Sequence, residues 1–160
     1  MKRSAILPIG AEKTGSTTLQ AFLAHNRIAL RKRGFCYPRF PGRRVHHALP
    51  VYAKRIDRAD DLHRFMQVSN EAELARFRRS LRRAARFELL TTRARTFIFS
   101  SEHLQSRLVH PDELQALKDF LDEFFADVQI SVYLRRQDRI AVSRYSTDVK
   151  SGRTLRTLLP

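Results

Sequence analysis

Residues 5–20, AILPIGAEKTGSTTLQ, decide the fold of this chain. An apolar run ends at Gly10, a loop carrying Lys13 follows, and a helical pattern opens with hydroxyl residues at Ser16. A strand, a tight loop and a helix in this order direct several backbone N–H groups and a helix N-terminus at one point. We therefore expect a loop that binds phosphate or sulfate.

The spacing of this loop differs from that of a triphosphate-binding loop, which has Gly, four residues and then Gly-Lys-Ser/Thr. Gly10 and Gly15 have the expected separation, but Ser16 stands in the lysine position and Lys13 precedes Gly15. This order disfavours an ordinary ATPase, GTPase or P-loop kinase and favours a different anion. The structural alternative is a simple glycine turn with Ser16 as the helix cap.

Composition indicates a globular protein with an anionic ligand. The chain has 160 residues, 42% of them hydrophobic, which fits a single domain over residues 1–160. It carries 31 Lys and Arg against 16 Asp and Glu, a net charge of +15, which favours nucleotides, nucleic acid, acidic glycans or a membrane surface. Cys36 is the only cysteine, so no internal disulfide forms. No segment reaches membrane-spanning length, and we expect a soluble, cytoplasmic protein.

Periodicity predicts alternating strands and helices. Strands are expected near residues 4–10, 34–38, 96–100 and 128–134, and helices over 16–32, weakly over 50–68, and over 74–87, 111–125 and 137–150. This alternation predicts a three-layer α/β fold with a parallel sheet flanked by helices. Ligands of such sheets bind beyond the carboxyl ends of the strands, so residues 13–18, 100–103 and 135–143 are expected to converge.

A second polar cluster follows the strand near 128–134. Arg135 stands at the strand end, where a guanidinium can bind a phosphate through two hydrogen bonds. Ser143 lies about two turns into the following helix and could reach the same phosphate. Taken alone, the run from Arg135 to Arg139 is also typical of a solvated helix start.

Together, the two clusters resemble the P-loop-like sulfotransferases, and residues 9–20, 100–104 and 134–138 are similar to the bacterial branch of that family. The resemblance implies a P-loop NTPase-like fold and 3′-phosphoadenosine 5′-phosphosulfate (PAPS) as co-substrate. It also implies that the loop holds the 5′-phosphosulfate through Lys13, Thr14, Gly15, Ser16, Thr17 and Thr18, and that Arg135 and Ser143 hold the 3′-phosphate.

Sulfuryl transfer requires two further functions. Lys13 can stabilise the charge on the leaving phosphate, and a base must accept the proton of the acceptor. Glu102 and His103, which follow the strand at 96–100, are both candidates for this base. We favour Glu102 and regard His46 and His47 as weaker candidates, because loop histidines are usually solvated. We predict no metal site, because the leaving group carries less charge than a triphosphate.

The acceptor is expected to be a hydroxyl or amine of a carbohydrate or a small molecule. Arg76, Arg79, Arg83 and Arg86 share one face of the helix near 74–87, which is either a solvated face or a contact surface for an anionic glycan or membrane. We do not expect nucleic acid as the partner, because no recognition motif accompanies the basic charge. The oligomeric state does not follow from the sequence.

Members of the family that this chain resembles continue well beyond the length seen here. We therefore expect residues 1–160 to correspond to the N-terminal portion of the full family domain, an incomplete form of its fold. The alternative to a sulfotransferase is a truncated, inactive nucleotide- or anion-binding remnant, or one part of a split protein. The residues leave both open.

Overall fold

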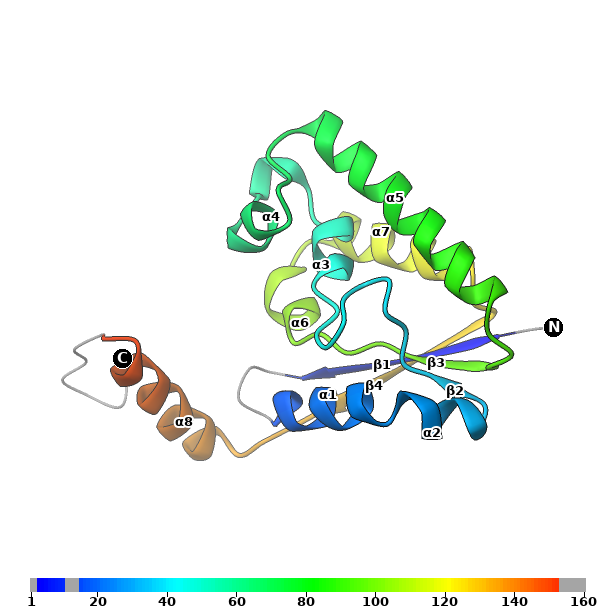
Figure 1. The fold of residues 1–160 in the computed structure, drawn as a ribbon. Helices are drawn as coiled ribbons and strands as arrows, with labels where there is room; N and C mark the ends of the chain where they lie inside the picture. The colour runs from blue at the N-terminus through cyan, green and yellow to red at the C-terminus, as the bar shows by residue number, and fades with distance from the viewer. Residues whose placement is uncertain (1–2, 11–14, 153–160) are drawn as a thin grey trace.

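The computed structural model describes residues 3–10 and 15–152. Its centre is a four-stranded, all-parallel sheet in the order β2-β3-β1-β4, shown in Figure 1. The strands are β1 (Ser4–Gly10), β2 (Phe35–Cys36), β3 (Thr96–Ile98) and β4 (Asp127–Tyr133). In the register of the sheet, Ala5 of β1 pairs with Phe97 on one side and with Val128 on the other. The predicted α/β class with a parallel sheet is confirmed.

Helices cover both faces of the sheet. They are α1 (Ser16–His25), α2 (Arg27–Lys32), α3 (Ala48–Ala53), the 3₁₀ helix η1 (Ile56–Arg58), α4 (Asp61–Phe65), α5 (Glu71–Leu90), α6 (His103–Arg107), α7 (Pro111–Asp122) and α8 (Gln137–Lys150). One face carries α1 and α2, and the other carries α3, α5, α6 and α7 (Figure 1). Helix α8 extends away from this body beyond the carboxyl end of β4, and none of its residues is buried.

The core lies between the sheet and the larger helical layer. Its main part is a set of packed aromatic rings, in which Tyr52 of α3 lies 4.6 Å from Phe120 of α7, and Phe97 of β3 lies 5.3 Å from Phe125, between ring centroids. Ala5 and Leu7 contribute from β1. Because aromatic side chains bury large areas, this cluster fixes the central strands against α7 and thereby sets the position of their carboxyl ends.

The helix expected over residues 16–32 is divided at Asn26, which separates α1 from α2. The Asn26 side chain donates a hydrogen bond to the Phe22 carbonyl at 2.8 Å, as an ending helix requires. Phe22 of α1 is 58% exposed. Gln20 is buried instead, and its Nε2 donates to Ser100 Oγ at 3.4 Å. The buried side of α1 is therefore held in part by a polar contact to Ser100, which follows β3.

Helix α5 is longer than expected and begins with a cap shared by two residues. Asn70 Oδ1 accepts the backbone N–H of Glu73 at 3.0 Å, and the Glu73 carboxylate accepts the N–H of Ser69 at 2.7 Å. The arginines expected on one face, Arg76, Arg79, Arg83 and Arg86, are all exposed. Asn70 is thus the capping residue, and Ser69 before it donates to the returning Glu73 carboxylate.

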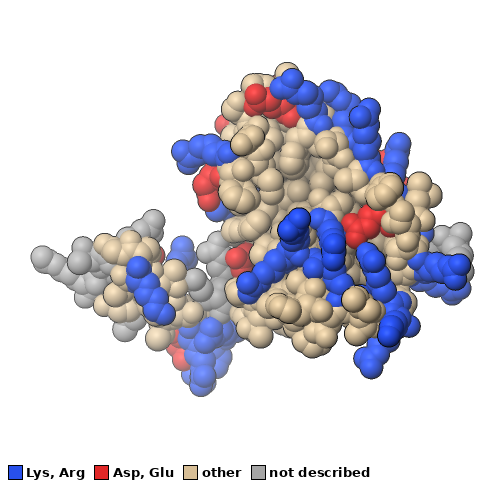
Figure 2. Space-filling model, in the orientation of Figure 1, with Lys and Arg blue, Asp and Glu red and all other residues tan. Residues whose placement is uncertain are grey.

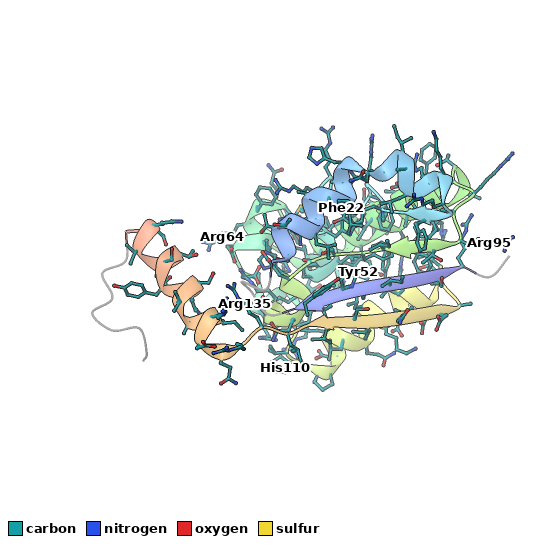
Figure 3. The ribbon with its side chains drawn as sticks, turned by 90° about the horizontal axis from the view of Figure 1, so that it is seen from below. Phe22, Tyr52, Arg64, Arg95, His110 and Arg135 are labelled. Atoms are coloured by element: carbon teal, nitrogen blue, oxygen red, sulfur yellow. The ribbon has the colours of Figure 1, made fainter. Side chains whose placement is uncertain are left out.

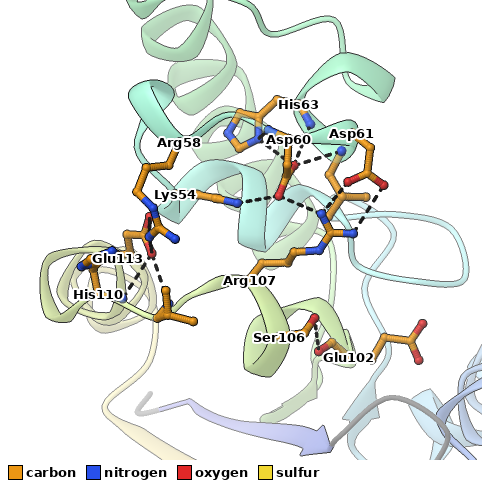
Figure 4. A network of polar contacts seen from close by, with 12 residues as sticks. Lys54, Arg58, Asp60, Asp61, His63, Glu102, Ser106, Arg107, His110 and Glu113 are labelled. Carbon is orange, nitrogen blue, oxygen red and sulfur yellow. Dashed lines mark hydrogen bonds and ion pairs between the residues drawn. The ribbon is translucent and has the colours of Figure 1, made fainter. Parts of the chain in front are cut away.

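A polar network joins the helical layer, as Figure 4 shows. Asp60, the N-cap of α4, accepts hydrogen bonds from Lys54 Nζ at 2.6 Å and from Arg107 Nη1 at 3.0 Å, and its other oxygen lies 3.1 Å from His63 Nδ1. Burial alone would raise the pKa of Asp60, but the hydrogen bonds from Lys54 and His63 outweigh it and hold that pKa well below its ordinary value. Through Arg107, the network fixes α6 to α4.

The structure was also searched for membrane-spanning helices and for metal sites. No helix within residues 3–10 and 15–152 combines the length and hydropathy needed to cross a membrane. In the same ranges, no group of three or more His, Cys, Asp or Glu side chains is arranged to hold a metal ion.

Candidate functional site

The carboxyl ends of β1, β3 and β4 meet at the point where the strand order changes direction. β1 lies between β3 and β4, and the segments that follow β1 and β3 pass to opposite faces of the sheet, α1 on one face and α6 on the other. Parallel α/β sheets bind ligands at such a point. A small pocket of about 100 Å³ opens here. Its lining consists of Pro8, Ile9, Gly10, Gly15, Ser16, Leu19, Ser100, Glu102 and Tyr133.

Gly15 forms the turn into α1. It has φ 94° and ψ 13°, a left-handed conformation that favours glycine, and its carbonyl accepts the N–H groups of Thr18 at 3.2 Å and Leu19 at 3.4 Å. The first turn of α1 contains no acidic residue. Its leading N–H groups have no acceptor within the helix, so this end of α1 suits an anion.

Glu102 lies against this helix start. Ser16 Oγ donates a hydrogen bond to Glu102 Oε2, which connects the first residue of α1 with the N-cap residue of α6. Glu102 is the one charged residue among the described lining of the pocket. A carboxylate next to a helix N-terminus is favourable, so Glu102 lies where a ligand anion would also be attracted.

His46 holds the end of the β3 segment in place. Its Nδ1 accepts the N–H of Ser100 at 3.1 Å, its Nε2 donates to the Pro38 carbonyl at 3.2 Å, and its own N–H donates to the Ser100 carbonyl at 3.1 Å. Burial lowers the pKa of His46 to about 3, so the ring is neutral at neutral pH. The expectation that this loop histidine is solvated is wrong, because the loop folds back onto β3.

His103 lies beside His47 and is not among the residues that line the pocket with Glu102. The ring centroids of the two histidines are 5.1 Å apart, and the Nδ1 atom of each is buried without a hydrogen-bond partner among the described residues. Burial lowers the pKa of His47, and the nearby His103 lowers it further. Of the two candidate bases, Glu102 is therefore the one that lies at the start of α1 and lines the pocket there.

Arg135 and Ser143 share a second, open depression of about 380 Å³ at the start of α8. Its lining consists of Arg135, Asp138, Arg139, Val142, Ser143 and Ser146. Because α8 begins at Gln137, Ser143 lies two turns into the helix, as its position in the sequence predicted. Figure 3 shows Arg135 at the carboxyl end of the sheet and Arg95 at the opposite end.

The other residues predicted to bind the 5′-phosphosulfate belong to the loop before α1 and to the first turn of α1. Lys13 and Thr14 lie outside the described residues. Thr17 and Thr18 are exposed on the first turn of α1, and the Thr17 carbonyl accepts a hydrogen bond from Arg44 Nη2 at 3.4 Å. Figure 2 shows several groups of Lys and Arg side chains on the visible face, with few Asp and Glu side chains between them.

Tyr133 is a lining residue that sequence reasoning missed. It belongs to the first pocket, and it precedes Arg135 of the second depression by two residues, so the end of β4 connects the two. The alternation of a strand could have identified it, because residues two apart point to the same face, and Tyr133 is two residues before Arg135.

We compared the chain with protein-family models, with curated proteins and with solved structures, and none of the three comparisons gave a match.

Proposed function

We propose that this chain is a sulfotransferase-type domain that binds PAPS and transfers its sulfuryl group to a hydroxyl or amine acceptor. The observation that carries the proposal is the shared depression of Arg135 and Ser143 at the end of β4. It lies beyond the same sheet end as the pocket at the Gly15 turn. A ligand with two separated phosphate groups, such as an adenosine 3′,5′-bisphosphate, matches two anion sites connected by one strand.

The chemistry of the donors suits these two groups. At the Gly15 turn, the leading N–H groups of α1 and the hydroxyls of Thr17 and Thr18 can donate to the 5′-phosphosulfate, with Lys13 as the cation of the loop. The Ser16 hydroxyl has one proton, which it donates to Glu102, so it can donate to the phosphosulfate only after turning away from that carboxylate. At the second depression, the Arg135 guanidinium and the Ser143 hydroxyl can donate to the 3′-phosphate.

In the transfer step, Glu102 accepts the proton of the acceptor hydroxyl. The acceptor oxygen forms a bond to sulfur while the bond between sulfur and the bridging phosphate oxygen breaks, and the electron pair of that bond stays on the phosphate. The products are the sulfated acceptor and adenosine 3′,5′-bisphosphate. The position of Glu102 beside Ser16 supports this role, because a base must lie within reach of the reacting group.

The acceptor class is proposed to be a carbohydrate or small molecule. A depression of about 300 Å³ between the 39–43 loop and α5 is lined by Arg39, Arg43 and the apolar side chains of Phe40, Met66 and Phe77. Together with the exposed arginine face of α5, it suits an anionic glycan.

A second candidate is a nucleotide-binding unit without transfer activity. It is favoured by one observation: α8, which carries Ser143, buries no residue against the body. A 3′-phosphate site on an unsupported helix can bind a nucleotide, but it orients the phosphosulfate less well for in-line transfer. The two candidates predict the same ligand and differ in turnover.

Calorimetric titration with adenosine 3′,5′-bisphosphate and with 5′-AMP tests the proposal. We expect Arg135→Ala to weaken binding of the bisphosphate at least tenfold more than binding of 5′-AMP, because only the former has a 3′-phosphate. Arg95→Ala, which removes an exposed arginine at the opposite end of the sheet, is the matched control and should leave both affinities unchanged. Equal losses for the two nucleotides in Arg135→Ala would refute the assignment.

A further inference from the structure

A single hydrogen bond joins Ser16 and Glu102 across the pocket at the Gly15 turn. Ser16 is the first residue of α1, and Glu102 is the N-cap residue of α6. Both line the pocket, and the Ser16 hydroxyl donates its one proton to Glu102 Oε2. Among the described residues, the Glu102 carboxylate accepts no other hydrogen bond and forms no ion pair, so its charge is stabilised there by this contact.

The backbone of Glu102 is fixed. Its carbonyl accepts the N–H groups of Gln105 at 3.2 Å and Ser106 at 3.4 Å, and Arg107 at the end of α6 donates to Asp60 at 3.0 Å. The Glu102 side chain extends away from that network (Figure 4). Because α6 is held in this way, an anion that enters the pocket meets the Glu102 carboxylate and does not displace the helix.

An anion at the start of α1 changes the surroundings of Glu102 in two ways. It brings a second negative charge into a pocket of about 100 Å³. It also competes for the Ser16 hydroxyl, which has one proton to donate. A nearby like charge and the loss of a hydrogen bond to the charged form both favour the neutral form of a carboxyl group. The two changes therefore act in the same direction, toward stronger proton binding by Glu102.

We propose that Ser16 is a positioning residue that couples binding of the sulfuryl donor to the strength of the base. Its hydroxyl turns from Glu102 to the bound phosphosulfate, and Glu102 then binds a proton more strongly. The coupling rests on the proposed function, in which Glu102 takes the proton of the acceptor hydroxyl. An ionised carboxylate with a higher proton affinity is a better general base. The base is thus strengthened only when the donor is in place.

Other titratable groups near Glu102 come from further segments of the chain. Tyr133 at the end of β4 lines the same pocket. His47, the N-cap residue of α3, has its pKa lowered by burial and by His103, and the charge of Glu102 opposes that shift. Lys13 lies outside the described residues. Because these groups can also gain or lose protons when an anion binds, the test has to observe Glu102 itself.

NMR of the full chain, labelled at the glutamate carboxyl carbon, follows Glu102 directly, and Glu102→Gln assigns its signal. We expect Glu102 to titrate about one pH unit higher with saturating adenosine 3′,5′-bisphosphate than without it, which is about a tenfold gain in proton affinity. The signal of Glu71, on the exposed start of α5, should not move. An unchanged titration of Glu102 in the saturated wild type overturns the coupling.

Ser16→Ala tests the part of the hydroxyl. In the free variant, Glu102 should titrate at a higher pH than in the free wild type, because the hydrogen bond is lost. In the saturated state, the variant and the wild type should coincide. Thr17→Ala removes an exposed hydroxyl of the same turn that makes no hydrogen bond to Glu102 among the described residues, and it should keep the wild-type shift. A shift of wild-type size in Ser16→Ala overturns the role of Ser16.

Calorimetric titration of the same wild-type sample separates these outcomes from a failure of the proposed function. A wild type that does not bind adenosine 3′,5′-bisphosphate overturns both the proposed function and the coupling. Binding without a change in the titration of Glu102 overturns the coupling through Ser16 alone.

Discussion

The Ser16 hydroxyl donates a hydrogen bond to the Glu102 carboxylate, and this contact joins the start of α1 to the segment that follows β3. The same contact places one negative charge at a helix N-terminus that favours anions. Glu102 therefore has two consequences for the proposed site: it competes with a bound phosphate, and it lies where a base would be needed.

Glu102→Gln separates these two consequences. We expect the variant to bind adenosine 3′,5′-bisphosphate about 3- to 10-fold more tightly, because it removes a repulsion of about 1 kcal/mol between the carboxylate and the ligand. We expect sulfuryl transfer to fall by about a hundredfold or more, because the base is lost. Calorimetry and a radiolabelled-sulfate transfer assay measure the two effects, with Glu71→Gln on the exposed start of α5 as control. Weaker binding by Glu102→Gln would contradict this account of the site.

Gly15→Ala tests the turn into α1. An added methyl group would meet no atom of the described residues within 4 Å, but φ is 94°, so the substitution costs backbone strain of about 1–2 kcal/mol. Gly34 is a matched control, since it has φ 83° and is equally open. We expect Gly15→Ala and Gly34→Ala to lower the free energy of unfolding by similar amounts, while only Gly15→Ala weakens bisphosphate binding, by about tenfold. If both variants bound the nucleotide as the wild type does, the Gly15 turn would not form the anion site.

His46 makes the stability of the fold depend on pH. Its pKa of about 3 in the folded chain lies below the ordinary value of about 6.5, so the unfolded chain binds one more proton between these values. The stability that this neutral ring contributes is fully present above pH 6.5 and is lost as pH falls, by about 1.4 kcal/mol per pH unit.

His46→Gln should therefore show a shallower decline of the free energy of unfolding between pH 6.5 and pH 4. Denaturant unfolding at several pH values measures it. Parallel curves for the wild type and His46→Gln would show that His46 does not cause the decline.

The sequence predicted the sheet and most helices because their signals are local. The apolar runs near 4–10 and 128–134 became β1 and β4 with a shift of at most one residue, and Pro111 marked the start of α7. The proximity of Arg135 and Ser143 is also local, because both belong to one strand-to-helix turn, and this explains why they line one depression. Short-range hydrogen bonding and periodicity decide such features.

Other features depend on contacts between distant segments, which no single stretch of sequence specifies. The burial of His46 follows from its bonds to Ser100, and the burial of Gln20 from a contact with the same serine. The pairing of Ser16 with Glu102 likewise joins residues that are far apart in the chain. A pattern of loop residues indicates solvation, but tertiary packing overrides it when the loop folds onto a strand end.

The choice between a bisphosphate and a triphosphate tests the central claim most directly. Lys13 precedes Gly15, and Ser16 stands where a triphosphate loop has its lysine. In calorimetric titrations, we predict that the wild type binds adenosine 3′,5′-bisphosphate at least tenfold more tightly than ATP with Mg²⁺, and that Lys13→Ala removes most of this affinity. Tighter binding of ATP with Mg²⁺, together with indifference to the 3′-phosphate, would contradict the claim.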